Sequence, residues 1–433
     1  MLTANEIFFV IIYSIVFCYL ILKVPFFSRF ELSPRWIAGI FLLKVMAGGA
    51  YGIIHYYLYE GGDTFEYFKD SQVIVKSIKA DGIWMYLQLV FGISDPNPAA
   101  SIVPYKDAMS YFTNMNSYFI VRFNALADLF TFSHYYANMV IYNFFTLIGL
   151  LYLLRFLSEA NPEKKKFFTG ILFLFPSIVF WTSGIHKDGI AVAAIGFILW
   201  FSAEIKKRYS LSPVLTTNKL WPFIGLCFGI WLLAIVRIHL LILLMPCMIG
   251  YHLIKSSSKH SSLKFILIII VFYLAILNLK FLNRDWDLKD QMAMQQEEFY
   301  KQSTNADTLN LMEFDKGATG FLILILQALR NCLTQPLLWQ VSSFLQIIPA
   351  LDNIFIVLLF LTALRFYKKN SHSEHLFFLF SLFFSASVFV FVGSIVPIVG
   401  ALVRYKMPGL LFLALALITI IDARKIQSFF KKQ

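Results

Sequence analysis

The residues best suited to chemistry begin with an acidic stretch at residues 60–70, EGGDTFEYFKD, which directly follows an apolar run. Two adjacent glycines let the backbone turn there. Asp63, Glu66 and Asp70 then follow at i, i+3 and i+7, which places three carboxylates on one face of a helix. Asp63 is therefore the first candidate for a general base, and Glu66 is the second. The alternative is structural: Asp63 caps a helix, with Glu66 as its capping-box partner.

A second polar group lies in the stretch FPSIVFWTSGIHKDG at residues 175–189. The pattern predicts a tight turn between two spanning helices, with His186, Lys187 and Asp188 at the outer membrane surface. Solubility of the turn alone would not require Trp181 together with these three ionisable residues. The alternative is an ordinary interfacial turn, in which Trp181 joins the aromatic belt, Asp188 caps the next helix and Lys187 meets lipid phosphate.

Cations also occur at the ends of apolar runs on the side of the acidic stretch. We expect Arg237 and His239 at the outer end of a tight helical hairpin. We expect Arg404 and Lys406 at the start of the last helix. Cations on this side run against the positive-inside bias, and a phosphate-bearing ligand is one reason for them. Snorkelling toward lipid headgroups is the alternative.

Composition identifies the solvent of this chain as a bilayer. The mean hydropathy is +0.70, and 59% of the 433 residues are hydrophobic while 14% are charged, which excludes a soluble domain. The net charge of +12 comes from short segments between apolar runs, so it indicates topology and not a nucleic-acid partner. The four cysteines are scattered singly without a CxxC pair, so we expect neither disulfides nor a metal site.

The distribution of basic residues predicts the topology. Six segments are rich in Lys and Arg: Lys23/Arg29/Arg35, Arg155/Lys164/Lys165/Lys166, Lys206/Lys207/Arg208, Lys255/Lys259/Lys264, Arg365/Lys368/Lys369 and Arg424/Lys425/Lys431/Lys432. Placing all six in the cytoplasm requires an even number of crossings between consecutive segments. The eleven spans that result are 5–22, 36–58, 134–156, 167–183, 189–203, 220–237, 239–254, 265–281, 348–366, 375–393 and 403–422. The N-terminus is then outside and the C-terminus cytoplasmic.

The predicted fold class is all-α, a polytopic transmembrane helical bundle of about eleven spans that forms a single membrane domain over residues 1–433. Two long outer loops cover residues 59–116 and 282–319. An amphipathic helix at 117–132 and a re-entrant or interfacial segment at 320–346 follow them, because counting either as a span would break the parity. Arg122, Asp128 and Arg330 support this interpretation, since isolated charges are costly at the bilayer centre.

An acidic residue in a long outer loop after an early membrane helix, followed by many closely connected spans, resembles the C-type membrane glycosyltransferases that use polyprenyl-linked sugars. The segments FPSIVFWTSGIHKD and ALVRYKMP are similar to stretches of bacterial envelope-polysaccharide proteins in that superfamily. In those enzymes the acidic loop usually follows the first helix, whereas here it follows the second. The stretch is also not a paired acidic or Asp-x-Asp motif, so no obligatory metal is expected.

The resemblance implies a transferase of the bacterial inner membrane that moves a sugar from a polyprenyl-phosphate or polyprenyl-diphosphate donor to a glycan or lipid acceptor outside. Asp63 would be the catalytic carboxylate, with Glu66 the weaker candidate. Tyr67, Trp181 and Asp188 would support the site. The candidate contacts to lipid phosphate are Arg404, Lys406, Lys187, His186, Arg237, His239 and Arg122.

Three other functions stay open from the sequence. A surface-polysaccharide polymerase or ligase uses the same chemistry, although the late outer loop holds Arg284 and no His, which favours the simpler transferase. A transporter or flippase of lipid-linked glycans places ionisable groups within spans, and Lys44 is the candidate for such a group. A structural membrane subunit would show no convergent charge in its outer loops. The oligomeric state is not indicated.

Overall fold

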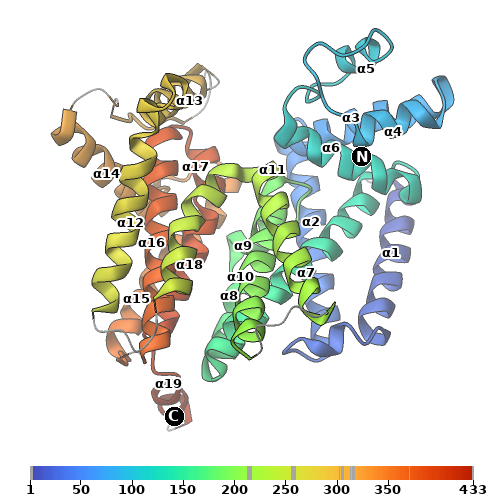
Figure 1. Cartoon of the computed structure of the whole chain (residues 1–433). Coiled ribbons are helices and arrows are strands. Elements are labelled where there is room, and N and C mark those ends of the chain that lie inside the picture. The colour runs from blue at the N-terminus through green and yellow to red at the C-terminus, as the bar shows by residue number, and fades with distance from the viewer. Residues whose placement is uncertain are drawn as a thin grey trace. The chain divides into compact units, whose positions relative to one another are not determined.

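The computed structural model describes residues 3–211, 217–254, 260–301, 303, 307–312, 314, 317–369 and 371–431 (Figure 1). In these ranges the chain is helical, with two isolated β-bridges and no strand. Eight of the described helices are long and apolar enough to cross a membrane, or nine when one bent pair is counted as a span. The chain is therefore a multi-pass helical membrane protein.

Packing divides the chain into two compact units. The first comprises Met1–Phe156 and Val179–Ile238, and the second comprises Leu157–Ile178 and His239–Gln433. The unit boundaries fall within three helices: α7 (Tyr135–Ala160), α9 (Pro176–Trp181) and α11 (Thr217–Leu253). The sequence alone indicated one membrane domain and did not suggest this grouping.

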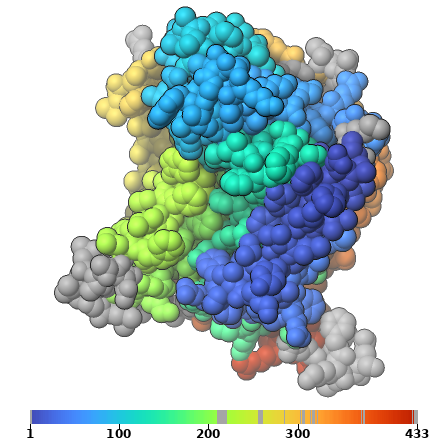
Figure 2. Space-filling view, turned by 90° about the vertical axis from the view of Figure 1, so that its right-hand side faces the viewer, coloured from blue at the N-terminus to red at the C-terminus, as the bar shows by residue number. Residues whose placement is uncertain are grey.

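The first unit contains two kinds of helix, long apolar ones and shorter polar ones. Besides parts of α7, α9 and α11, it holds α1 (Ala4–Lys23), η1 (Phe27–Arg29), α2 (Pro34–Leu58), α3 (Gly62–Ala80), α4 (Ile83–Phe91), α5 (Val103–Asp107), α6 (Met115–Thr131) and α10 (Lys187–Leu211). Helix α1 packs along α2, and α3 packs on α4 and α6. In the space-filling view, α1 (dark blue) covers one flank, with α3 and α4 (light blue) at one end of it (Figure 2).

The predicted outer loop at residues 59–116 is largely helical in the structure. Helix α3 begins after a turn in which Gly61 and Gly62 have φ of 96° and 56°, a backbone region that favours glycine. The predicted amphipathic helix at 117–132 corresponds to α6, whose start is capped by the Asn114 side chain accepting from the Ser117 amide at 3.2 Å. These helices form the polar end of the first unit.

The second unit is built around α16 (His372–Ile395), which packs against α14 (Gly317–Thr334) and α18 (Met407–Thr419). Helix α18 also packs against α8 (Lys165–Leu174) and α15 (Phe344–Arg365). The remaining elements are η2 (Pro162–Lys164), α12 (Ser261–Leu277), η3 (Leu279–Phe281), η4 (Arg284–Trp286), α13 (Leu288–Lys301), η5 (Leu338–Gln340), α17 (Val399–Tyr405) and α19 (Ala423–Lys431).

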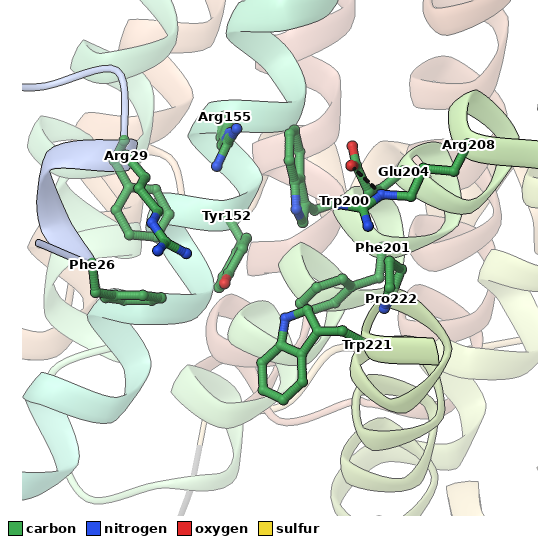
Figure 3. A pocket seen from close by; sticks show the side chains of 11 residues that line it. Phe26, Arg29, Tyr152, Arg155, Trp200, Phe201, Glu204, Arg208, Trp221 and Pro222 are labelled. Atoms are coloured by element: carbon green, nitrogen blue, oxygen red, sulfur yellow. Dashed lines mark hydrogen bonds and ion pairs between the residues drawn. The ribbon is translucent and has the colours of Figure 1, made fainter. Parts of the chain in front are cut away.

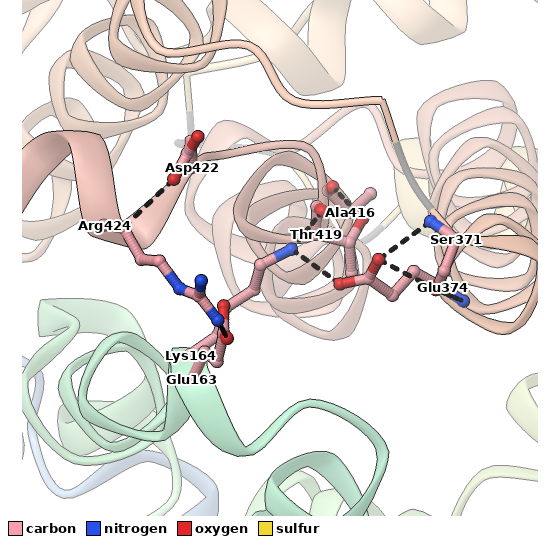
Figure 4. Close-up of polar contacts among 8 residues, drawn as sticks. All are labelled: Glu163, Lys164, Ser371, Glu374, Ala416, Thr419, Asp422 and Arg424. Carbon is pink, nitrogen blue, oxygen red and sulfur yellow. Dashed lines mark hydrogen bonds and ion pairs between the residues drawn. The ribbon is translucent and has the colours of Figure 1, made fainter.

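Polar contacts connect two of the predicted basic segments with the start of α16 at one end of the second unit (Figure 4). Lys164 Nζ lies 3.2 Å from Glu374 Oε1 and donates to the carbonyl of Thr419. Arg424 forms an ion pair with Glu163. Burial lowers the pKa of Lys164, and the nearby Glu374 carboxylate counteracts this. These contacts bring residues 163–164, 374 and 419–424 to one side of the unit, as the parity argument requires.

Four of the eleven predicted spans differ from the structure. The segment 167–183 is broken into α8 and α9, because Pro176 cannot continue the hydrogen-bonding pattern of the preceding helix. The segments 220–237 and 239–254 form one helical run, α11, whose backbone is non-helical at Arg237 (φ −155°, ψ 66°). The last predicted span, 403–422, corresponds to a pair bent by 48° between α17 and α18.

Two further predicted features are described only in part. The basic residues Lys255, Lys259 and Lys432 lie outside the described residues, as do parts of the loop at 282–319. The described portion of that loop contains α13. The predicted interfacial segment at 320–346 covers most of α14 and reaches the start of α15.

Candidate functional site

The turn between α9 and α10 is held in place by side chains of two spanning helices. The ammonium of Lys44, on α2, donates to the Thr182 carbonyl at 3.0 Å, to Thr182 Oγ1 at 2.9 Å and to Ser183 Oγ at 3.2 Å. From α7, Asn143 Nδ2 donates to the Ser183 carbonyl at 2.8 Å, and the Tyr142 hydroxyl donates to the His186 carbonyl. The backbone that carries His186 is thereby fixed from two sides.

Close packing around this turn depends on a glycine. A Cβ atom at Gly184 would overlap the ring of Tyr51, which is itself fully buried on α2. The ring of Tyr51 in turn stacks on His55 at 3.9 Å between centroids and contacts Trp181 at 5.9 Å. The absence of a side chain at position 184 thus lets α2 approach the turn closely.

His186 lies between two carboxylates. Its Nε2 is 3.4 Å from Asp63 Oδ2, and its Nδ1 is 3.1 Å from Asp188 Oδ2. Behind Asp188, Arg237 donates to Oδ1 at 2.7 Å. His186, Asp188 and Arg237 are buried, whereas 42% of the Asp63 side chain is exposed. We call Asp63, His186, Asp188 and Arg237 the Asp63 chain. Three of these ionisable side chains are buried, and the fourth, Asp63, is partly exposed.

Asp63 lies in the first turn of α3, where the helix dipole stabilises a negative charge. Its Oδ1 accepts a hydrogen bond from the Tyr111 hydroxyl at 2.9 Å. One face of α3 positions this tyrosine, because Asp70 accepts from the backbone amides of Ser110 and Tyr111 at 3.1 and 2.9 Å. The N-cap is Gly61 and not Asp63, so the interpretation of Asp63 as a capping residue is wrong.

The environment keeps Tyr111 protonated. Burial, followed by the negative charge of Asp63, raises the pKa of the Tyr111 hydroxyl far above its ordinary value. Tyr111 is therefore a permanent donor to Asp63. The ring of Tyr67 lies beside it, with centroids 4.8 Å from Tyr111 and 5.9 Å from His186. Burial also raises the pKa of Asp70, against the lowering effect of its two amide donors.

The geometry of the Asp63 chain restricts where protons can lie. An imidazole ring donates from both nitrogens only when it carries both protons. A neutral ring that carries its proton on Nε2 donates to Asp63 Oδ2 and leaves that carboxylate ionised. Asp63 and His186 therefore share one exchangeable proton, while Arg237 balances the charge of Asp188. Such a pair can take a proton from a bound hydroxyl group.

The other predicted residues of the first unit have different surroundings. Glu66 pairs with Lys69 at 2.5 Å and does not reach the Asp63 chain. Arg122 donates to the carbonyls of Leu89 and Gly92 and lies over the ring of Tyr118. Its contacts are those of a residue that holds the α4–α6 segment together.

The predicted interfacial turn is buried instead of facing the membrane surface. Trp181 is 2% exposed, so it does not join a lipid-facing aromatic belt, and His186 and Asp188 lie beneath α3 and the segment at 110–111. Lys187 donates to Ser117 Oγ at 3.1 Å. Lys187 is partly exposed, and His186 contacts the partly exposed Asp63.

Three predicted phosphate-binding residues belong to the second unit. His239 stacks on Phe391 with ring centroids 5.2 Å apart. Arg404 lies over the ring of Tyr405, 5.3 Å from its centroid. Lys406 is fully buried and donates to the carbonyls of Cys332 and Gln335 and to Asn353 Oδ1, at 2.8, 2.6 and 3.2 Å. The contacts of Lys406 are therefore structural.

The sequence did not single out Tyr111 or the role of Lys44. Tyr111 lies in the irregular stretch between α5 and α6, where no spacing marks it. Among the described residues no group of three His, Cys, Asp or Glu side chains is arranged to hold a metal ion. In comparisons with protein-family models, with curated proteins and with solved structures, none matches this chain.

Proposed function

We propose that this protein is a membrane glycosyltransferase that moves a sugar from a polyprenyl-phosphate or polyprenyl-diphosphate donor to an acceptor at the extracytoplasmic face of a bacterial inner membrane. One observation carries the proposal: a half-exposed carboxylate, Asp63, is oriented by Tyr111 and connected through His186 to a buried ion pair. General-base catalysis on a sugar hydroxyl group needs a carboxylate that is both oriented and accessible.

In this reaction Asp63 accepts the proton of the acceptor hydroxyl group. The acceptor oxygen forms a bond to the anomeric carbon of the donor sugar, while the bond from that carbon to the phosphate oxygen breaks and the lipid phosphate leaves with the electron pair. Tyr111 holds Oδ1 of Asp63, so Oδ2 is the atom shared between His186 and the substrate. Lys187, next to His186 at the start of α10, is the cation we assign to the departing phosphate.

The first test is the removal of the base. In proteoliposomes supplied with a panel of polyprenyl-phosphate sugars, Asp63→Asn should lower the rate of lipid-phosphate release by about 10²- to 10⁴-fold. Glu66→Gln is the matched control, because Glu66 lies one turn further along α3 and its side chain forms an ion pair with Lys69. A folded Asp63→Asn protein with wild-type activity would refute the assignment.

The alternative function, a transporter of lipid-linked glycans, depended mainly on Lys44. Lys44 was the ionisable group expected within a span, yet its three protons point to three oxygens of residues 182 and 183. An ammonium with a complete set of acceptors does not offer a binding site to a passing ion. If flux of a lipid-linked glycan persisted in Asp63→Asn and disappeared in Lys44→Met, transport would replace catalysis as the function.

A further inference from the structure

At the end of the first unit opposite the start of α3, a cavity of about 210 Å³ collects basic and aromatic side chains (Figure 3). Its cations are Arg29 from η1, Arg155 from α7 and Arg208 from α10. These belong to three of the segments that the parity argument placed in the cytoplasm. The cavity is therefore separate from the Asp63 chain, which lies at the other ends of the same helices.

The charge of the cavity is positive. Among the described residues that line it, Glu204 is the one acidic residue, so the three arginines and this glutamate give a net charge of +2. Arg208 Nε donates to Glu204 Oε1 at 2.7 Å, and the side chain of Arg208 is 36% exposed. Arg155 lies over the ring of Trp200, 4.3 Å from its centroid. Stacking on the indole ring fixes the plane of this guanidinium group.

Aromatic rings form the remaining walls. The ring of Tyr152 packs edge-on against Phe30, with centroids 5.2 Å apart, and is tilted against Phe201 at 5.1 Å. Trp221 also lines the cavity. Several arginines from separate elements in an apolar frame are the donors that suit the planar, multiple acceptors of a phosphate group. The chemistry that this cavity recognises is thus a phosphate ester.

The surface next to the cavity, on α11, indicates which class of phosphate ester the cavity suits. Trp221, Ile224, Phe228 and Trp231 are exposed along α11 at spacings of three and four residues, so they form one outward face of a spanning helix. This face meets the acyl chains of the bilayer. A ligand with its phosphate among the arginines would have apolar chains lying along this face, which a soluble phosphate lacks.

We propose that this cavity binds the phosphate of an anionic phospholipid headgroup, with the acyl chains along the outward face of α11. The site is distinct from that of the donor lipid in the proposed reaction, because it lies at the other end of the unit. The ligand would hold η1, the end of α7 and the end of α10 together, and so stabilise the first unit.

The proposal predicts lipid selectivity in the purified full-length protein. Native mass spectrometry in detergent should show phosphatidylglycerol bound about tenfold more tightly than phosphatidylcholine. The triple variant Arg29→Gln/Arg155→Gln/Arg208→Gln should lose this difference. The control Lys23→Gln/Arg35→Gln/Lys207→Gln removes the same charge outside the cavity, from two of the three basic segments, and should keep the difference.

Three results would overturn the proposal. Equal binding of the two lipids to the wild type would show that the arginines do not select the headgroup. Equal loss in the control variant would show that total charge, not the cavity, determines binding. Competition by sn-glycerol 3-phosphate at the same concentration would show that the ligand is a soluble phosphate. If the triple variant does not fold, Arg208→Gln alone should weaken phosphatidylglycerol binding about threefold to tenfold, and unchanged binding would count against the site.

Discussion

Each unit contains a buried lysine, and the two lysines differ in the chain segment whose oxygens they bind. Lys44 in the first unit and Lys406 in the second are each surrounded by three oxygen acceptors. Lys406 fixes the end of α14 and the residue that follows it, through the carbonyls of Cys332 and Gln335. Lys44 fixes the turn that presents His186 to Asp63. A buried ammonium is thus a structural device in both units, and chemistry depends on what the fixed segment carries.

The largest effect should come from breaking the ion pair behind His186. In Asp188→Ala, Arg237 stays buried without its carboxylate, which should cost about 3–5 kcal/mol of folding stability, measured by thermal unfolding in detergent. The double variant Asp188→Ala/Arg237→Met removes both charges and should recover most of this loss. It should not recover transfer activity, because His186 has then lost the carboxylate at Nδ1.

Recovery of both stability and activity in the double variant would show that Asp188 only neutralises Arg237. Recovery of neither would show that the buried pair makes further contacts on which the unit depends. The expected split between the two measurements separates the positioning of His186 from simple folding.

The second effect compares the lysines directly. Lys44→Met and Lys406→Met each remove three hydrogen bonds to buried oxygens, and each should cost about 2–3 kcal/mol of stability. In the folded fraction, only Lys44→Met should lower transfer, by about tenfold, since the His186 turn then loses its position. Equal loss of activity per folded molecule in both variants would remove the difference between the units.

How far the sequence predicts this architecture can be judged from particular residues. Composition and apolar run length identify a helical membrane protein, because the bilayer imposes these on any multi-pass chain. Pro176 lies within residues 167–183, which hydropathy alone joined into one predicted span. Proline has no backbone amide donor, so the helix breaks there even though the apolar run is long enough for a single span.

The sequence indicated which residues belong to the candidate site, but it did not indicate which of them contact one another. Asp63 and His186 were both singled out, but a pair separated by 123 positions leaves no local pattern. Tyr111 was missed because its role depends on Asp70 holding its backbone. Arg237 was expected as a ligand contact, whereas the structure pairs it with Asp188, since a buried guanidinium group requires a carboxylate.

A smaller effect concerns the hydrogen bond that orients the base. Tyr111→Phe removes the donor to Asp63 Oδ1 and should lower the transfer rate about tenfold with little change in folding, because a hydrogen bond to a charged group is worth roughly 1.5 kcal/mol. Tyr118→Phe is the matched control, a buried tyrosine of the same unit whose hydroxyl donates to the Leu89 carbonyl at 2.9 Å. An equal loss of activity in the control would show that the effect of Tyr111→Phe is not specific to the hydrogen bond with Asp63.

The smallest effect tests a buried carboxylate of the first unit that lies away from the Asp63 chain. Asp128 accepts from Ser71 Oγ at 2.8 Å and from Asn138 Nδ2 at 2.7 Å. Burial nevertheless raises its pKa from 3.8 to about 6. Because the folded state binds this proton more tightly than the unfolded chain, the stabilising contribution is complete below about pH 4 and is lost as the pH rises through about 6.

Thermal unfolding should therefore show a loss of about 1 kcal/mol between pH 5 and pH 7 from this residue. Asp128→Asn should abolish that part of the pH dependence while Asp63→Asn leaves it in place, since the two carboxylates contact different partners. A pH profile unchanged in Asp128→Asn would mean that Asp128 is ionised throughout. The polar contacts from Ser71 and Asn138 would then outweigh the cost of burial, and the polar end of the first unit would be a fully charged network.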